Sequence, residues 1–93
     1  MIESAIESAC VHHAAKHGIL SYKLRSGVTG VPDRLFLLPG GRVWLVEFKA
    51  KGGALSPRQK WVHEELNKAV HMVSVIRSLE EFKGELTLRL DLL

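Results

Sequence analysis

The chain has 93 residues, of which 46% are hydrophobic and 25% charged, with a formal charge of +3 and a pI near 9.3. This size predicts one domain with a modest core, and the mild basicity is compatible with a nucleic-acid partner without establishing one. No apolar run approaches the roughly 18 residues of a membrane span, and the acidic start M-I-E-S-A-I-E-S does not resemble a secretory signal. A single cysteine, Cys10, excludes an internal disulfide and is typical of a reducing cytoplasm.

The first expected element is a helix over residues 2–17. The residues expected to form its buried stripe recur at helical spacing: Ile2, Ile6, Ala9 and His13. A zinc site built from Cys10, His13 and His17 would need more ligands at suitable spacing, so none is expected. A short strand over 19–24 should follow, and then a loop over 25–32. The G-x-x-G of that loop lacks the lysine and the following helix of a phosphate-binding loop.

The stretch from Val31 to Ala50 reads V-P-D-R-L-F-L-L-P-G-G-R-V-W-L-V-E-F-K-A and predicts a β-hairpin. If Pro39-Gly40-Gly41 is a three-residue loop, Asp33 opposes Glu47, and opposed residues point to the same side of a sheet. Lys49 follows on that side because side chains alternate along a strand. A two-residue loop would instead put the two carboxylates on opposite faces, so a site at this end requires the odd-length turn.

Both faces of this hairpin are apolar up to its charged end, which predicts a central position covered by helices on both sides. One face carries Leu35, Leu37, Val43 and Leu45. The other carries Phe36, Leu38, Trp44, Val46 and Phe48.

A capping box of Ser56 and Gln59, with Pro57 in the first turn, predicts a helix that runs to about Ala69. The residues expected to face the sheet are Gln59, Val62, Leu66 and Ala69, while Trp61 should project elsewhere. A strand over 70–77 should pair in parallel after this crossover helix. A second capping box at 78–81 predicts one or two helical turns ended by Gly84, and the alternation over 85–93 predicts a half-buried strand at an edge or in a dimer interface. The expected class is therefore α/β, a mixed sheet flanked by helices in the order αβββαβ, with a C-terminal short helix and strand.

The charged end of the hairpin favours metal-assisted phosphodiester hydrolysis. Two nearby carboxylates, Asp33 and Glu47, repel each other when both are ionised, and Mg²⁺ or Mn²⁺ relieves this in an all-oxygen site. Lys49 can stabilise a phosphate or orient an attacking water. Taken alone, each residue is better explained structurally: Asp33 ends a turn, and Glu47 and Lys49 mark a strand emerging into solvent. Their registered opposition favours a site, as does the neighbouring basic stretch expected to contact DNA, namely Lys51, Arg58 and Lys60.

The spacing P-D, about a dozen residues, then E-F-K resembles the Pro-Asp…(Asp/Glu)-x-Lys nuclease superfamily. The longer string G-V-P-D-R-L-F-L-L-P-G-G-R-V-W-L-V-E-F-K-A-K-G-G-A-L-S-P-R-Q resembles the VRR-NUC (virus-type replication–repair nuclease) domains, over a span from Glu3 to about Phe82. The resemblance implies a restriction-endonuclease-like core and a Mg²⁺-dependent endonuclease acting on DNA. It also implies a homodimer that cuts branched substrates such as four-way (Holliday) junctions.

The same resemblance implies roles for individual residues. Asp33, Glu47 and the main-chain carbonyl of Phe48 would be metal ligands, and Lys49 would be the catalytic lysine. Gln59 would support the site, although its place in the capping box explains it as well. A glutamate of the first helix also belongs to the pattern; Glu3 fits better than Glu7, and either could instead be a solvated helix start. The alternative function is a non-catalytic DNA-binding or assembly module that retains the nuclease fold.

Overall fold

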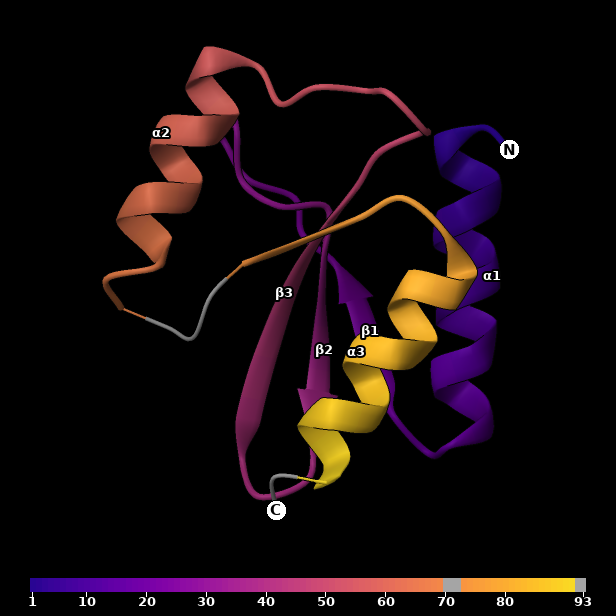
Figure 1. Cartoon of the computed structure of the whole chain (residues 1–93). Coiled ribbons are helices and arrows are strands. Elements are labelled where there is room, and N and C mark those ends of the chain that lie inside the picture. Colours follow the sequence, from indigo (N-terminus) through magenta and orange to yellow (C-terminus); the bar gives the residue numbers. More distant parts are fainter. Residues whose placement is uncertain (70–72, 92–93) are drawn as a thin grey trace.

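A mixed β-sheet with helices around it forms the body of the protein (Figure 1). The computed structural model describes residues 1–69 and 73–91. Its elements in chain order are α1 (Glu3–Lys16), β1 (Leu20–Lys23), β2 (Arg34–Leu38), β3 (Arg42–Phe48), α2 (Pro57–Leu66), β4 (Ser74–Ile76) and α3 (Leu79–Asp91). The strands are ordered β1-β2-β3-β4; the first three pair antiparallel, and β4 pairs in parallel with β3. The predicted α/β class and the order αβββαβ are confirmed.

The β2–β3 hairpin has the odd-length turn on which the site depends. Leu38 pairs with Arg42 across Pro39, Gly40 and Gly41, and the register continues to Arg34 opposite Val46. Gly40 and Gly41 have φ of 81° and 75°, a left-handed conformation that suits glycine. One step further along this register, Asp33 lies opposite Glu47, as predicted.

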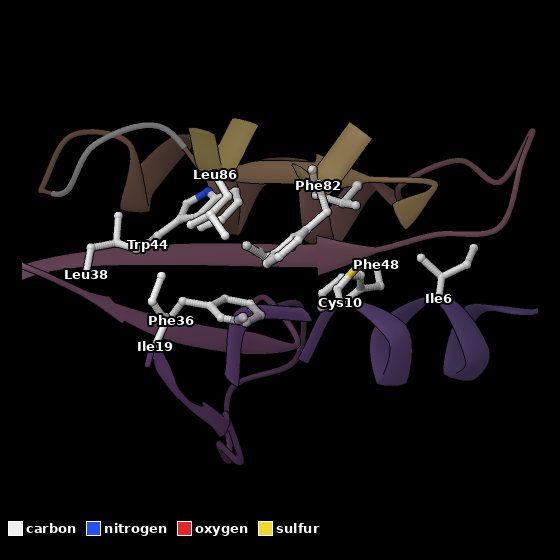
Figure 2. Close-up of a cluster of buried hydrophobic side chains, with 12 residues drawn as sticks. Ile6, Cys10, Ile19, Phe36, Leu38, Trp44, Phe48, Phe82 and Leu86 are labelled. Carbon is white, nitrogen blue, oxygen red and sulfur yellow. The ribbon is translucent and has the colours of Figure 1, made fainter. Parts of the chain in front are cut away.

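One face of the sheet carries the core. Phe36, Phe48 and Val46 are fully buried there, and Trp44 and Leu38 nearly so. Helices α1 and α3 cover this face, and Figure 2 shows Phe82 and Leu86 of α3 together with Ile6 and Cys10 of α1 in the same cluster. The rings of Trp44 and Phe82 stack with their centroids 5.0 Å apart.

The opposite face is not covered as the sequence led us to expect. Four apolar side chains of β1, β2 and β3 are exposed there: Leu20 by 59%, Tyr22 by 57%, Leu37 by 39% and Val43 by 39%. The predicted cover of this face is therefore only partial among the described residues: Leu45 is 8% exposed and Glu47 1%, whereas the four side chains above are open to solvent.

The predicted C-terminal strand was wrong, because α3 continues through Gly84 to Asp91; of the residues predicted to form that strand, 92–93 lie outside the described part. The leucine alternation also contains a helical pattern: Phe82, Leu86 and Leu90 face the core at four-residue spacing, whereas Leu88 is 65% exposed. Only half of the predicted capping box starts α3: the Glu81 N–H donates to the Ser78 hydroxyl, but the Glu81 Oε1 accepts the main-chain N–H of Arg77 rather than that of Ser78. Packing of this apolar stripe on the sheet outweighs the weak helix propensity of one glycine.

Two smaller expectations also need correction. The buried stripe of α1 is Ile6, Cys10 and Ala14, while Ile2 is 69% exposed, so the stripe runs one position away from the one predicted. Helix α2 has its predicted capping box but ends at Leu66 rather than Ala69. The expected strand over 70–77 is confirmed only as β4, and residues 70–72 lie outside the described part. Among the described residues, no helix is both long enough and apolar enough to cross a membrane.

Candidate active site

Three charged side chains meet where the hairpin ends. The Asp33 Oδ2 accepts the main-chain N–H of Phe48 at 2.7 Å, which fixes the aspartate beside the end of β3. Glu47 is 1% exposed, and the Lys49 Nζ lies 3.9 Å from its Oε2. The turn-defined register therefore gathers Asp33, Glu47 and Lys49 as the sequence predicted.

Glu47 is held in an environment that disfavours its charge. Burial, followed by the negative charge of Asp33, raises the pKa of Glu47 to about 8, and Lys49 offsets only part of this. Its Oε1 has no hydrogen-bond partner among the described residues. A buried carboxyl in this state is stabilised by a proton or by a cation.

Gln59 makes a contact consistent with each of the two roles that the sequence left open. Its side-chain oxygen accepts the Ser56 main-chain N–H at 2.9 Å, which completes the capping box. Its Nε2 donates to the Glu47 Oε2 at 3.4 Å. One side chain thus starts α2 and joins that helix to the buried carboxyl.

His63 belongs to this site and was missed in the sequence analysis. Its Nε2 lies 3.6 Å from the Glu47 Oε1, and its side chain is 7% exposed. Burial lowers the pKa of His63, the nearby Lys49 adds to this, and Asp33 opposes it. The available signal was its position four residues after Gln59, which places both side chains on one face of α2.

Helix α2 reaches the site by a close approach to the loop before β2. Gly30 has a φ of +98°, and a Cβ there would lie 3.0 Å from the Arg58 carbonyl oxygen and 3.1 Å from the Val62 Cγ2. The Arg58 side chain also donates to the Thr29 carbonyl at 3.2 Å. The loop therefore holds the helix at a distance that only glycine permits.

The two candidate glutamates of α1 have different surroundings. Glu7 is paired with Arg34 at 2.9 Å and with Lys23 at 3.2 Å, away from the carboxyl pair. Glu3 is exposed, but its charge contributes to the raised pKa of Glu47. The ion pairs of Glu7 and the effect of the Glu3 charge on Glu47 together favour Glu3 over Glu7 as the α1 residue associated with the site.

The basic residues predicted to contact DNA are solvent-accessible. Lys51, Arg58 and Lys60 are all exposed. The Arg58 guanidinium lies 4.9 Å from the centre of the Trp61 ring, which is itself 53% exposed. Lys51 lies three residues after the end of β3, and the other two lie on the first turn of α2, so all three are close in sequence to the elements that form the site.

The donor set fits a hard divalent cation. In the described part of the chain no three His, Cys, Asp or Glu side chains are grouped closely enough to hold a metal by themselves. The two carboxyls would need main-chain oxygen and water to complete the shell, which is the way Mg²⁺ is usually held. The orphaned Oε1 of Glu47 and the mutual repulsion of the two acids supply the need for positive charge.

The fold and these residues define a nuclease domain, and the comparisons with known proteins agree. The chain is 42% identical over 77 residues to the protein named "Putative nuclease p44" of Acyrthosiphon pisum secondary endosymbiont phage 1, a match that covers 82% of this chain and 83% of that protein. A solved structure described as "VRR_NUC domain" superposes with a TM-score of 0.83 at 29% identity, over 91% of this chain and 94% of that one. A second, described as "VRR_NUC domain protein", has a TM-score of 0.75 over 94% and 86% of the two chains; at 15% identity it supports the fold alone. No family model matches the sequence. The chain belongs to the VRR-NUC family of nucleases.

Proposed function

We propose that this nuclease is a divalent-metal-dependent endonuclease that acts on DNA, with Mg²⁺ or Mn²⁺ held by Asp33, Glu47 and the main-chain carbonyl of Phe48. The observation that carries the proposal is the Asp33–Glu47 pair, in which the burial of Glu47, followed by the negative charge of Asp33, raises the pKa of Glu47 to about 8. The Phe48 N–H points toward Asp33. In a β-strand the C=O of a residue points to the same side as its N–H, so this carbonyl is available beside the two acids.

Each residue of the site then has a distinct task in hydrolysis. A bound divalent cation supplies positive charge to the scissile phosphate and lowers the pKa of the attacking water. Lys49 binds a phosphate oxygen or orients the water, since its ammonium is held within 3.9 Å of Glu47 by the site itself. Gln59 keeps the Glu47 carboxylate in place, and Glu3 adds a further carboxylate from α1. Lys51, Arg58 and Lys60 bind the phosphate backbone beside the site.

The substrate we propose is branched double-stranded DNA such as a four-way junction, cut by a homodimer. The exposed apolar face made by Leu20, Tyr22, Leu37 and Val43 supports self-association, because apolar side chains from three adjacent strands are rarely left open on a monomer. A dimer carries two sites, which suits paired incisions across a junction.

A cleavage assay with labelled four-way junction, flap and linear duplex, in Mg²⁺, Mn²⁺ or EDTA, tests the proposal. We expect metal-dependent cutting of the branched substrates, and loss of about 10³-fold or more in rate for Asp33→Asn and Lys49→Ala with DNA affinity largely retained. Lys16→Ala, which removes an exposed charge at the far end of α1, is the control and should cut normally. Binding of DNA without cleavage in any divalent metal would instead make the protein a DNA-binding or assembly module.

A further inference from the structure

His63 faces a partner that it does not quite reach. Its Nε2 and the Glu47 Oε1 are 3.6 Å apart, and neither atom has another hydrogen-bond partner among the described residues. Both side chains are almost completely buried, so water does not readily satisfy these atoms. Unpaired polar atoms in a protein interior are costly, which indicates that the two act on each other or on a bound group.

Gln59 lies one helical turn before His63 on the same face of α2. Its amide nitrogen is 3.4 Å from the other oxygen of Glu47. The two side chains of α2 therefore lie beside the two oxygens of a single carboxyl, Gln59 at Oε2 and His63 at Oε1. Contact at both oxygens restricts rotation of the carboxyl plane, which contact at one oxygen does not.

We propose that His63 is a positioning residue, which donates its Nε2–H to the Glu47 Oε1 and, with Gln59, orients this carboxylate toward the divalent cation. The inference rests on the proposed function, because binding the cation is the task for which the carboxylate is oriented. An ordinary N–H···O bond is about 2.9–3.0 Å long, so a small shift of the imidazole ring completes the contact. The neutral ring suffices as a donor. Hydrogen bonds from such outer residues orient metal ligands and contribute to metal affinity.

Calorimetric titration of Mn²⁺ into the DNA-free protein provides the main test. We expect His63→Leu to raise the Mn²⁺ Kd by about 10-fold or more, the usual cost of losing an outer hydrogen bond to a ligand. His63→Gln keeps an amide donor of similar reach and should stay within a few-fold of the unaltered protein. Glu64→Gln, at an exposed neighbouring position on α2, is the control and should bind normally. Unchanged affinity in His63→Leu overturns the proposal. An equal loss in both His63 variants also overturns it, because that result makes His63 a direct ligand.

Crystal structures of the metal-free variants give a readout that does not depend on metal or activity. Glu47 should adopt one conformer in the unaltered protein and in His63→Gln, and several conformers or a displaced one in His63→Leu. A Glu47 carboxyl that stays in place in His63→Leu overturns the positioning role, and His63→Met serves the same purpose if the leucine variant does not fold. If the unaltered protein neither binds Mn²⁺ nor cuts DNA, the proposed function fails, while the Glu47 conformers still decide the role of His63.

Discussion

Glu47 is the residue on which most of the site's physical constraints converge. Glutamate is rarely buried without a partner, yet this one is 1% exposed, lies beside a second acid and has an oxygen with no hydrogen bond among the described residues. A purely structural role would favour an apolar residue here, since Leu45 and Val46 precede it on the same strand. The proposed cation site would account for the cost of burying this carboxyl.

The raised pKa of Glu47 has a measurable consequence for stability. Folded Glu47 titrates near pH 8 rather than at the ordinary value of 4.5, so the folded state binds more protons than the unfolded state between these values. The free energy of unfolding must then fall as the pH rises through this window. Replacing Glu47 by Gln removes this contribution, so the variant should lose less stability than the unaltered protein between pH 5 and pH 8.5.

Urea unfolding in EDTA at several pH values measures this difference. Glu64→Gln removes an exposed carboxyl from α2 and is the matched control, for which we expect the pH dependence of the unaltered protein. Parallel stability profiles for the unaltered protein and Glu47→Gln would contradict the raised pKa.

At the scale of elements, the position of α2 decides whether the site is assembled. The helix brings Gln59 and His63 to Glu47, and its contact with the loop before β2 depends on Gly30. A Cβ at position 30 would lie 3.0 Å from the Arg58 carbonyl oxygen of α2. The residue that carries it would also have to adopt a φ of +98°. Both effects push the helix away from the sheet or strain the loop.

We expect Gly30→Ala to lower the free energy of unfolding by about 1–3 kcal/mol and to reduce cleavage by more than that loss of folded protein explains. Gly27→Ala is a close control, because a Cβ at Gly27 has no neighbour within 4 Å and needs no left-handed backbone. That variant should be nearly neutral in both measurements. Chemical unfolding and cleavage rates at a temperature where both variants are folded test the prediction, and equal behaviour of the two would refute the role of the close approach.

The sequence was most informative where local chemistry determines the structure. Pro39-Gly40-Gly41 sets the hairpin register, and with it the opposition of Asp33 and Glu47, through turn geometry alone. The capping box of Ser56 and Gln59 likewise places the start of α2 without reference to the rest of the fold. Both features were predicted correctly because the residues that determine them are neighbours in the chain.

Prediction from the sequence failed where contacts between distant segments determine the structure. The residues from Glu85 onward fit a two-residue period and a helical period about equally, and the packing of Phe82 and Leu86 on the sheet selects the helix. His63 reads as an ordinary helix residue until α2 is placed across the end of β3, where it meets Glu47. A four-residue spacing from Gln59 was present in the sequence, but nothing local shows which face of the helix lies on the site.

At the scale of the whole molecule, the sheet has one covered face and one partly open face, on which Leu20, Tyr22, Leu37 and Val43 are exposed (Figure 1). Helices α1 and α3 pack on the first, and the carboxyl pair lies at the end of the second, because Glu47 alternates with the core residues Val46 and Phe48. A partner on the open face would therefore lie on the same side of the sheet as the two acids. This arrangement would bring the sites of two protomers toward a common substrate.

Replacing an apolar side chain of the open face by a charged one tests the proposed homodimer. An isologous contact repeats each substitution twice near the symmetry axis, so Leu37→Lys introduces two cations into an apolar interface and should convert a dimer to a monomer. Leu88→Lys makes the same chemical change at a leucine that is 65% exposed on α3, outside the open face, and is the matched control.

Light scattering after size-exclusion chromatography, over a range of concentrations, should find dimers for the unaltered protein and Leu88→Lys and monomers for Leu37→Lys. Because Leu37 is already 39% exposed, the monomeric variant should keep its circular dichroism spectrum and its affinity for Mn²⁺, while losing paired incision of a four-way junction. A Leu37→Lys protein that stays dimeric would exclude this face as the interface, whereas a monomeric unaltered protein would exclude the homodimer itself.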